Sequence, residues 1–396
     1  MNKSCRNLIF ILILVLFAAP LARAEQETEV SLSETLQTFA PPPTFASLDD
    51  QTITDNGTDD PISEEVPLQG VEMATADGSV EIVVTAVGDL TIGGDVRKSG
   101  LSIFEKENEK QGGDPSFVMR NVKELFSEDH LTLANFEGTL TTAPIPGNKK
   151  GNSFLFSAPP EYVKILEAGS IESVSFENNH VMDHGEEGFR ETTAKFDEAG
   201  IVWSSENHVG VFETSGVTIG MLSYQTFNGR YPDLFDKVPG QVQQAKAQYD
   251  IVIVSYHWGD ELDYKPNTNQ QKLGRLTIDA GADLVVGHHS HRINPIEKYK
   301  DRYIAYSLGN FSFAGNTKPD DMSTFFLQVK FNVKDDITSS TGFRIIPARI
   351  SSKSDYNDFA PMPFTEQRLI DNVVNCLLSN GKSMEYAVQA YPLEWE

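Results

Sequence analysis

Three histidines lie within four positions of the chain, at His288, His289 and His291, shortly after the predicted strand 283–286. The whole sequence of 396 residues contains only eight histidines. One interpretation is a solvent-exposed turn that happens to be rich in histidine. The alternative is a buried strand whose carboxyl end presents imidazoles to a metal ion, because open α/β sheets bind ligands at that edge.

Other predicted strands are also followed by side chains of types that can bind metals. Five strand ends carry carboxylate, amide or imidazole groups, and they are Asp89, Glu137, residues 177–180, residues 257–261 and residues 287–291. Each of the first four alone has an ordinary interpretation, such as a turn acid, a helix cap or a buried histidine. Their coincidence favours a metal centre, and ligands without cysteine suit Mn, Zn, Fe or a similar divalent ion.

Predicted strands and helices alternate in the part of the chain that must position these side chains. The strands are predicted at residues 81–87, 131–136, 172–176, 217–224, 250–256, 283–286 and 303–307, and the helices at 117–126, 186–199 and 270–280. Two antiparallel strands, 325–333 and 343–350, and a helix at 364–378 are predicted to follow. This alternation predicts an α/β sheet with crossover connections.

The first 24 residues have the pattern of a secretory signal peptide. Lys3 and Arg6 precede the apolar run 8–19, and Ala22 and Ala24 form a small-residue cleavage site. The run is shorter than the roughly 20 residues of a membrane span. We therefore expect a secreted or extracytoplasmic protein, and the alternative is an uncleaved N-terminal anchor.

Residues 25–80 are predicted to be an acidic disordered spacer. They contain 13 acidic residues, and no lysine or arginine occurs between Arg23 and Arg97. Few large apolar residues and much like charge favour a chain that stays unfolded. The formal net charge of −25 argues against nucleic-acid binding, which needs a basic surface. Cys376 is the only cysteine after the signal segment, so no internal disulfide is expected.

Six ordered motifs resemble the CapA family of bacterial capsule and poly-γ-glutamate synthesis proteins. They are GDLTIGGDV, ANFEGTL, ENNHVMDHGEEGF, YHWGDE, GADLVVGHHSH and IAYSLGNFSF. The resemblance covers residues 82–313 and is expected to extend to about 363. That family is considered a distant relative of the calcineurin-like metallophosphoesterases. The resemblance therefore implies an α/β domain over residues 81–363, built as a sandwich of two mixed β-sheets flanked by helices, with 364–396 as a C-terminal helix and tail.

The resemblance also implies roles for individual residues. The implied metal ligands are Asp89, Glu137, Asn179, His257, His289 and His291, and His180 is the implied catalytic residue that acts on the leaving group. Three positions depart from the pattern. Thr91 stands where the phosphoesterases have a histidine, Glu137 replaces a bridging aspartate, and Glu177 stands where a small residue is more frequent.

Two main functions follow from these residues. One is a metal-dependent hydrolase or transferase of the cell envelope, in which His180 is the general acid or base and Asp183 and Glu261 orient imidazoles. The other is a non-catalytic assembly factor that retains the fold; a metal-binding sensor or scaffold is a third. The expected partner is an anionic cell-envelope polymer or its synthesis machinery, near a membrane or wall.

Overall fold

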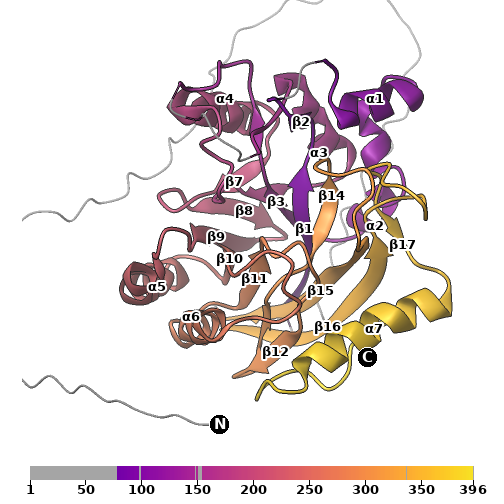
Figure 1. Cartoon of the computed structure of the whole chain (residues 1–396). Helices are drawn as coiled ribbons and strands as arrows, with labels where there is room; N and C mark the ends of the chain where they lie inside the picture. Colours follow the sequence, from indigo (N-terminus) through magenta and orange to yellow (C-terminus); the bar gives the residue numbers. More distant parts are fainter. Residues whose placement is uncertain (1–77, 98–99, 148, 150–153, 336, 396) are drawn as a thin grey trace, which may run out of the picture. The chain divides into compact units, whose positions relative to one another are not determined.

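The computed structural model describes residues 78–97, 100–147, 149, 154–335 and 337–395 (Figure 1). The described residues belong to one compact unit. The predicted signal segment and nearly all of the predicted spacer lie outside them.

The larger sheet has eight strands and contains β1, which runs through its middle. Its order is β17 (Met362–Pro363), β16 (Ile337–Arg349), β15 (Ser323–Lys334), β1 (Val80–Thr91), β3 (Leu131–Phe136), β6 (Ser173–Ser175) and β7 (Val202–Ser204), with β14 (Asn310–Phe313) also paired to β1. β1 is parallel to β3 and β14 and antiparallel to β15. The sheet is therefore mixed.

The second sheet has six strands with a parallel centre. Its order is β12 (Ile296–Tyr299), β13 (Arg302–Ala305), β11 (Leu284–His288), β10 (Ile251–His257), β9 (Val217–Gln225) and β8 (Gly210–Thr214). The two edge strands, β12 and β8, pair antiparallel with their neighbours. A third, small sheet consists of β2 (Gly94–Asp95), β5 (Phe156–Ala158) and β4 (Thr139–Leu140).

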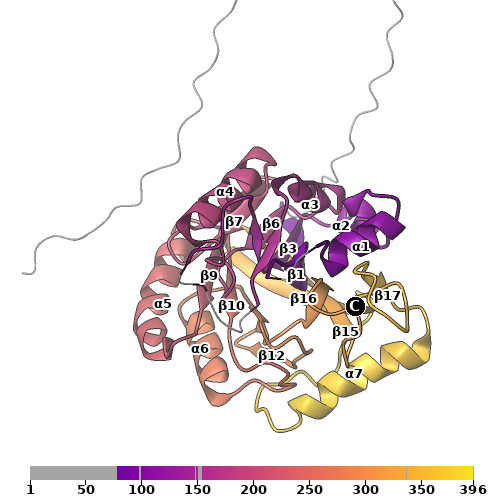
Figure 2. The same cartoon turned by 45° about the horizontal axis from the view of Figure 1, so that its top comes forward.

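Helices surround the two large sheets (Figure 2). They are α1 (Ile103–Lys110), α2 (Lys123–Phe126), α3 (Lys164–Ala168), α4 (Gly185–Glu198), α5 (Tyr231–Lys246), α6 (Thr268–Asp279) and α7 (Gln367–Gly381), with 3-10 turns η1 (Pro115–Met119) and η2 (Pro160–Val163). The predicted helix 117–126 is instead split into η1 and α2. Tight i-to-i+3 bonds, such as Val122 N to Met119 O at 3.0 Å, interrupt it.

The two large sheets pack face to face, as the alternation on β10 shows. Ile251 and Ile253 lie in an apolar core with residues of β1, β3 and β15 from the other sheet. Val252 and Val254 point to the opposite face, where they pack against α5 and α6. Because successive side chains of a strand point to opposite faces, a strand covered on both sides is apolar throughout. The predicted α/β sandwich of two mixed sheets flanked by helices is confirmed.

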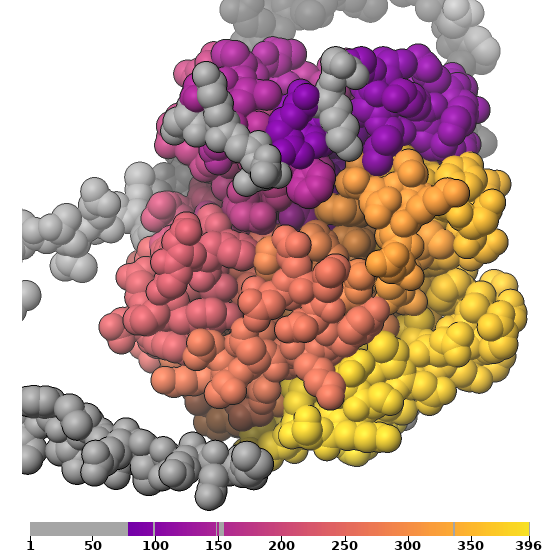
Figure 3. Space-filling view, viewed as in Figure 1, coloured from indigo at the N-terminus to yellow at the C-terminus, as the bar shows by residue number. Residues whose placement is uncertain are grey.

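The C-terminal helix α7 is part of this packing. Val373 and Leu377 are buried in the core between the sheets. The yellow C-terminal segment lies directly against the orange segment that precedes it in the space-filling view (Figure 3). No helix among the described residues is long and apolar enough to cross a membrane.

A partly buried acid near the amino end of β3 predicts a pH-dependent stability. Thr132 Oγ1 donates to Asp129 Oδ2 at 2.8 Å, and burial raises the pKa of Asp129 from 3.8 to about 7. The folded state therefore favours the protonated acid, so this contribution to stability is complete below about pH 4 and is lost as the pH rises through 7. We expect Asp129→Asn to raise the free energy of unfolding by about 1–2 kcal/mol at pH 8 and to change it little at pH 4.

Urea unfolding at both pH values measures this difference. Glu128→Gln, one residue earlier and exposed, is the matched control and should change the free energy of unfolding by less than about 0.5 kcal/mol at either pH. An equal effect of Asp129→Asn at pH 4 and pH 8 would contradict the prediction.

Candidate metal centre

The carboxyl ends of β1, β3, β10 and β11 from the two large sheets lie close together, and most of the predicted site residues lie there. Asp89 is near the end of β1, His257 is the last residue of β10 and His288 is the last residue of β11. β10 and β11 are parallel and pair in register, with His257 opposite His288. The apolar strands thus carry their polar terminal residues to a common edge.

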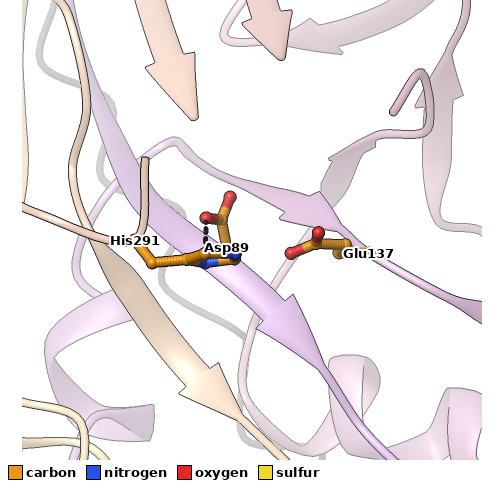
Figure 4. Close-up of side chains that lie close together, drawn as sticks. All are labelled: Asp89, Glu137 and His291. Carbon is orange, nitrogen blue, oxygen red and sulfur yellow. Dashed lines mark ion pairs between the residues drawn. The ribbon is translucent and has the colours of Figure 1, made fainter. Parts of the chain in front are cut away.

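Asp89, Glu137 and His291 form the centre of this group (Figure 4). One potential ligand atom from each of the three residues lies within 4.8 Å of the others. His291 Nδ1 is 3.2 Å from Asp89 Oδ2. Two carboxylates and an imidazole at this spacing match the donors that a divalent transition metal accepts.

Burial and close contact change the charges of these three groups in different directions. Burial raises the pKa of Asp89, but the imidazoles of His288 and His291 outweigh it and hold that pKa well below the usual value. Burial lowers the pKa of His291, but contact with Asp89 reverses the effect and raises it to about 9. Burial raises the pKa of Glu137, and His291 opposes this only in part. Such a concentration of perturbed groups is typical of functional sites.

His257 and His289 lie next to this group. His257 Nε2 is 3.1 Å from His289 Nδ1 and 3.7 Å from Glu137 Oε1. Burial lowers the pKa of His257 well below 6.5 and that of His289 to about 4. The two imidazoles are therefore neutral near pH 7, which is the state that binds metals.

The backbone of the last two histidines is in an unfavourable conformation. His289 has φ = 89° and His291 has φ = 54°, in the region that favours glycine. Outliers of this kind occur mainly where surrounding structure holds a functional residue in place. Their occurrence at the His289-Ser290-His291 turn supports a functional role for this pair.

His180 approaches the group from the loop after β6, and an acid orients it. Its Nδ1 donates to Asp183 Oδ2 at 2.7 Å, and the same oxygen accepts from Phe156 N at 2.8 Å. Its Nε2 is 3.7 Å from Glu137 Oε1. Burial lowers the pKa of His180, but Asp183 and Glu137 outweigh it and raise that pKa above 6.5. This is the geometry of an oriented acid–base imidazole.

Among the described residues, Asn179 makes no hydrogen bond to the group, and it is exposed. The preceding residue, Asn178, is buried instead. Asn178 Nδ2 donates to Phe136 O at 2.8 Å and lies 3.3 Å from Asn135 Oδ1, and Asn178 Oδ1 accepts from His180 N at 3.0 Å. Asn178 therefore holds the His180 loop against β3, while the role of Asn179 stays a prediction.

Three residues at the site were not assigned a role from the sequence. Asn135 Nδ2 donates to Asp89 Oδ1 at 2.8 Å, Asn310 Oδ1 accepts from His291 Nδ1 at 2.8 Å, and His288 Nδ1 is 3.5 Å from Asp89 Oδ1. All three residues stand within the motifs ANFEGTL, IAYSLGNFSF and GADLVVGHHSH. Their place in the motifs indicated that they could belong to the site. Their contacts could not be predicted, because the contacting strands are distant in sequence.

Buried polar atoms without partners indicate that the group fits a metal ion. Glu137 Oε2, both ring nitrogens of His288 and Thr91 Oγ1 are buried and have no hydrogen-bond partner among the described residues. An unsatisfied buried polar atom costs about 1–3 kcal/mol, so native structures rarely retain several in one place. An ion with its bound water would satisfy such atoms.

Comparison with known proteins agrees with the motifs. A family model described as bacterial capsule synthesis protein PGA_cap matches residues 83–314, which contain every residue of the group described above. The chain belongs to this family.

Three relatives of this PGA_cap protein show the extent of the similarity. The PGA biosynthesis protein CapA of Bacillus subtilis strain 168 is 29% identical over 324 residues, which cover 76% of this chain and 79% of that protein. The capsule biosynthesis protein CapA of Bacillus anthracis is 29% identical over 299 residues, which cover 69% of each. A probable polyglutamine synthesis accessory protein of Mycobacterium tuberculosis H37Rv is 30% identical over 209 residues, 46% of this chain and 54% of that protein.

Solved structures are similar only at a low level. The calcineurin-like phosphoesterase YfkN of Bacillus subtilis has a TM-score of 0.41 and 14% identity, with 77% of this chain and 100% of that chain covered. A hypothetical protein of Thermus thermophilus has a TM-score of 0.42 and 14% identity, with 67% of this chain and 98% of that chain covered. These TM-scores are too low for a functional comparison.

Proposed function

We propose that this PGA_cap protein takes part in the synthesis or export of a capsule or poly-γ-glutamate polymer. The family description and the names of the two Bacillus relatives support this proposal. Its partners are the anionic polymer or the machinery that makes it. The protein acts outside the cytoplasm, as the signal-peptide pattern of residues 1–24 predicts.

The chemistry at the centre is that of a metal-dependent hydrolase or transferase. Asp89, Glu137, His257, His289 and His291 would hold the ion. A divalent ion bound there supplies a Lewis acid that polarises a phosphoryl or carbonyl oxygen and lowers the pKa of a bound water. Glu137 Oε2 is buried and has no hydrogen-bond partner among the described residues. This atom most directly supports the proposed set of metal ligands.

The arrangement of His180 carries the catalytic part of the proposal. Asp183 holds Nδ1, so Nε2 is left to face Glu137 and the centre. An imidazole in this position can give a proton to a leaving group or remove one from an attacking group. A buried imidazole oriented by a buried carboxylate is the arrangement that acid–base catalysis uses.

Removal of the two strained histidines tests whether the group binds metal. We expect the double variant His289→Ala, His291→Ala to lose metal affinity by at least about 100-fold, because even loss of a partner that supports a ligand costs about 10–100-fold. Elemental analysis of the purified protein and calorimetric titration with Mn²⁺ and Zn²⁺ measure the change.

His208→Ala is the matched control for this experiment. His208 is exposed and stacks on Trp203 with ring centroids 3.8 Å apart, away from the centre. We expect this variant to retain metal like the unchanged protein. Full metal retention by the double variant would refute the metal centre.

Turnover assays on two substrate classes test the reaction. A phosphodiester and a γ-glutamyl polymer should be compared with the metal-loaded protein, since the ion can polarise the phosphoryl oxygen of one or the carbonyl oxygen of the other. Hydrolysis or transfer on either substrate would support the enzyme hypothesis if the double variant His289→Ala, His291→Ala has lost this activity.

Thr91 supports a second candidate function, the non-catalytic assembly factor. Its hydroxyl is buried without a partner among the described residues, at the position where the resemblance implies a histidine ligand. A protein that uses the fold only for assembly would tolerate the loss of this metal ligand, because it catalyses no reaction. Metal binding without turnover on either substrate, together with normal polymer production by the His180→Ala variant, would favour this candidate.

N-terminal sequencing of the protein released by cells tests the location. Cleavage after Ala24 is expected, because Ala22 and Ala24 supply the small residues that signal cleavage requires. An intact Met1 on a membrane-bound product would identify an anchor instead.

A further inference from the structure

One buried arginine next to the centre has no acid to neutralise it. Arg292 directly follows His291, and only 9% of its surface is exposed. Its Nη1 donates to His291 O at 2.9 Å, and it makes no ion pair with an acid among the described residues. A guanidinium stays charged at any physiological pH and carries five N–H groups, so most of these groups lack a partner in this part of the chain.

Two other arginines show the usual arrangement. Arg120 Nη2 lies 2.9 Å from Asp358 Oδ2, and Arg275 Nη2 lies 2.6 Å from Glu297 Oε1. Both arginines are more exposed than Arg292, yet each has an acid partner. Because a buried charge is strongly unfavourable without an opposite charge beside it, Arg292 indicates a site whose anion comes from outside the chain.

An aromatic ring holds the guanidinium of Arg292 in place. The guanidinium carbon lies 5.7 Å from the centre of the Tyr264 ring. Tyr264 OH in turn donates to Asp321 Oδ2 at 2.7 Å, and Asp321 Oδ1 accepts from Ser323 N at 2.8 Å. Both oxygens of Asp321 thus have other partners. A guanidinium over an aromatic ring keeps the N–H groups at its edge available for hydrogen bonds.

Arg292 and Tyr264 belong to two segments that border the centre. Tyr264 lies in the loop after β10, and Arg292 lies in the turn after β11, which also carries the proposed ligand His291. A hydrogen bond of 2.8 Å from Leu262 N to Ser290 O joins the loop to the turn. Because Arg292 Nη1 contacts the carbonyl of His291, an anion bound to Arg292 would lie close to a substrate at the centre.

The acidity of the chain favours such a cation if the substrate is an anion. The formal net charge is −25, and Asp89 and Glu137 add two carboxylates at the centre itself. In γ-linked glutamate, each residue has a free carboxylate on the carbon next to its amide nitrogen. That carboxylate is therefore only a few bonds away from the carbonyl that the ion would polarise. The fork of N–H groups on a guanidinium matches the two oxygens of a carboxylate.

We propose that Arg292 binds a free carboxylate of the substrate, next to the bond that lies at the centre, and that Tyr264 holds the guanidinium for this contact. The choice of a γ-linked glutamate chain rests on the proposed function. The ligand class is an anion with two oxygens that the guanidinium binds together. A phosphoryl group shares this chemistry, and the experiment separates the two sources.

Calorimetric titration with a matched pair of peptides tests the inference. The pair is tri-γ-glutamate and its analogue in which every α-carboxylate is an amide, so the two differ in charge and hardly in size. We expect the unchanged protein to bind tri-γ-glutamate about 10–100-fold more tightly than the analogue, because the analogue cannot accept charge-assisted bonds from Arg292. Arg292→Gln should lose this preference, and Arg292→Lys, which keeps the charge without the fork, should retain part of it.

Titration of the same proteins with Mn²⁺ distinguishes binding of substrate from support of the turn. The Mn²⁺ affinity of Arg292→Gln should stay within about threefold of that of the unchanged protein, because Arg292 is not one of the proposed metal ligands. Arg190→Gln, which removes an exposed arginine from α4, is the control and should change neither measurement. Equal losses of Mn²⁺ affinity and peptide affinity in Arg292→Gln would assign Arg292 to the support of the turn and overturn the inference.

The other outcomes separate this inference from the proposed function. Equal affinity of the unchanged protein for the two peptides, or no binding of either, would overturn the inference without any variant. Binding of methyl phosphate that Arg292→Gln abolishes, without a preference between the peptides, would assign the site to a phosphoryl group and refute the carboxylate. Absence of Mn²⁺ binding by the unchanged protein would count against the metal centre, whereas a preference of the metal-free protein for tri-γ-glutamate that Arg292→Gln loses would still support Arg292.

Discussion

Replacement of His180 by alanine is expected to lower turnover by about 10²–10⁴-fold while the metal content stays unchanged. The side chain lies on the edge of the group, and its nearest approach is 3.7 Å from Nε2 to Glu137 Oε1. Removal of the imidazole therefore takes away the proposed proton-transfer group and leaves Asp89 and His291 in place. Turnover on the active substrate and elemental analysis of the same sample measure the two effects.

The substitution Asp183→Asn gives a graded comparison for this prediction. An asparagine can keep the bond from Phe156 N, but it no longer stabilises a protonated His180 with a full negative charge. We expect a smaller loss of turnover, about 10–100-fold, with the metal retained. Loss of metal in His180→Ala would show that this histidine is a ligand and would contradict its assignment as the acid–base group.

Polymer production in cells separates the enzyme from the assembly factor. Cells that carry only the His180→Ala protein should make little polymer if the reaction is required. Normal production with a stable variant protein would show that the fold is sufficient without the proton-transfer group.

The substitution Gly287→Ala is expected to destabilise the protein by about 3 kcal/mol or more. A Cβ at this position would lie 2.1 Å from Tyr306 O and 2.3 Å from Trp258 Nε1. These two atoms form a 2.9 Å hydrogen bond that crosses the glycine. Backbone and a fully buried tryptophan cannot both move away, so the strand must shift or the bond must break.

The effect should reach the centre, because His288 to His291 directly follow Gly287. We expect the melting temperature to fall by about 5–10 °C and the affinity for Mn²⁺ to fall with it. Thermal unfolding and calorimetric titration measure these changes.

Gly342→Ala is the matched control, because it is also a strand glycine but a Cβ there meets no atom within 4 Å. It should change the free energy of unfolding by less than about 0.5 kcal/mol. A Gly287→Ala protein as stable as this control would contradict the close packing of β10 and β11 against Tyr306.

Local sequence patterns predicted most elements of the fold. The strand 131–136 has the predicted bounds, and the predicted helix 186–199 is α4 shifted by one residue. Helix α5 was not predicted, because Pro239 in its interior is a residue that normally interrupts helices. Its buried face, which includes Leu234, Val238 and Val242, packs against the outer side of the second sheet and stabilises the helix despite the proline.

The sequence by itself predicted a metal site and most of the residues that the structure brings together there. Histidines and carboxylates directly follow apolar strands, and parallel strands bring their carboxyl ends to one edge, so the convergence of Asp89, Glu137 and His291 follows from local patterns. The motifs of the PGA_cap family extend over the same residues.

Only the tertiary structure decided which atoms of these residues meet. The register of β1 with β3 and β14 places Asn135 and Asn310 on either side of Asp89, although 46 positions separate Asn135 from Asp89 in the chain. The direction of Asn178 into the site and of Asn179 towards solvent depends on the turn after β6. Strand register, side-chain direction and the packing of one sheet on the other are set by contacts between distant segments, and no local pattern of residue types contains them.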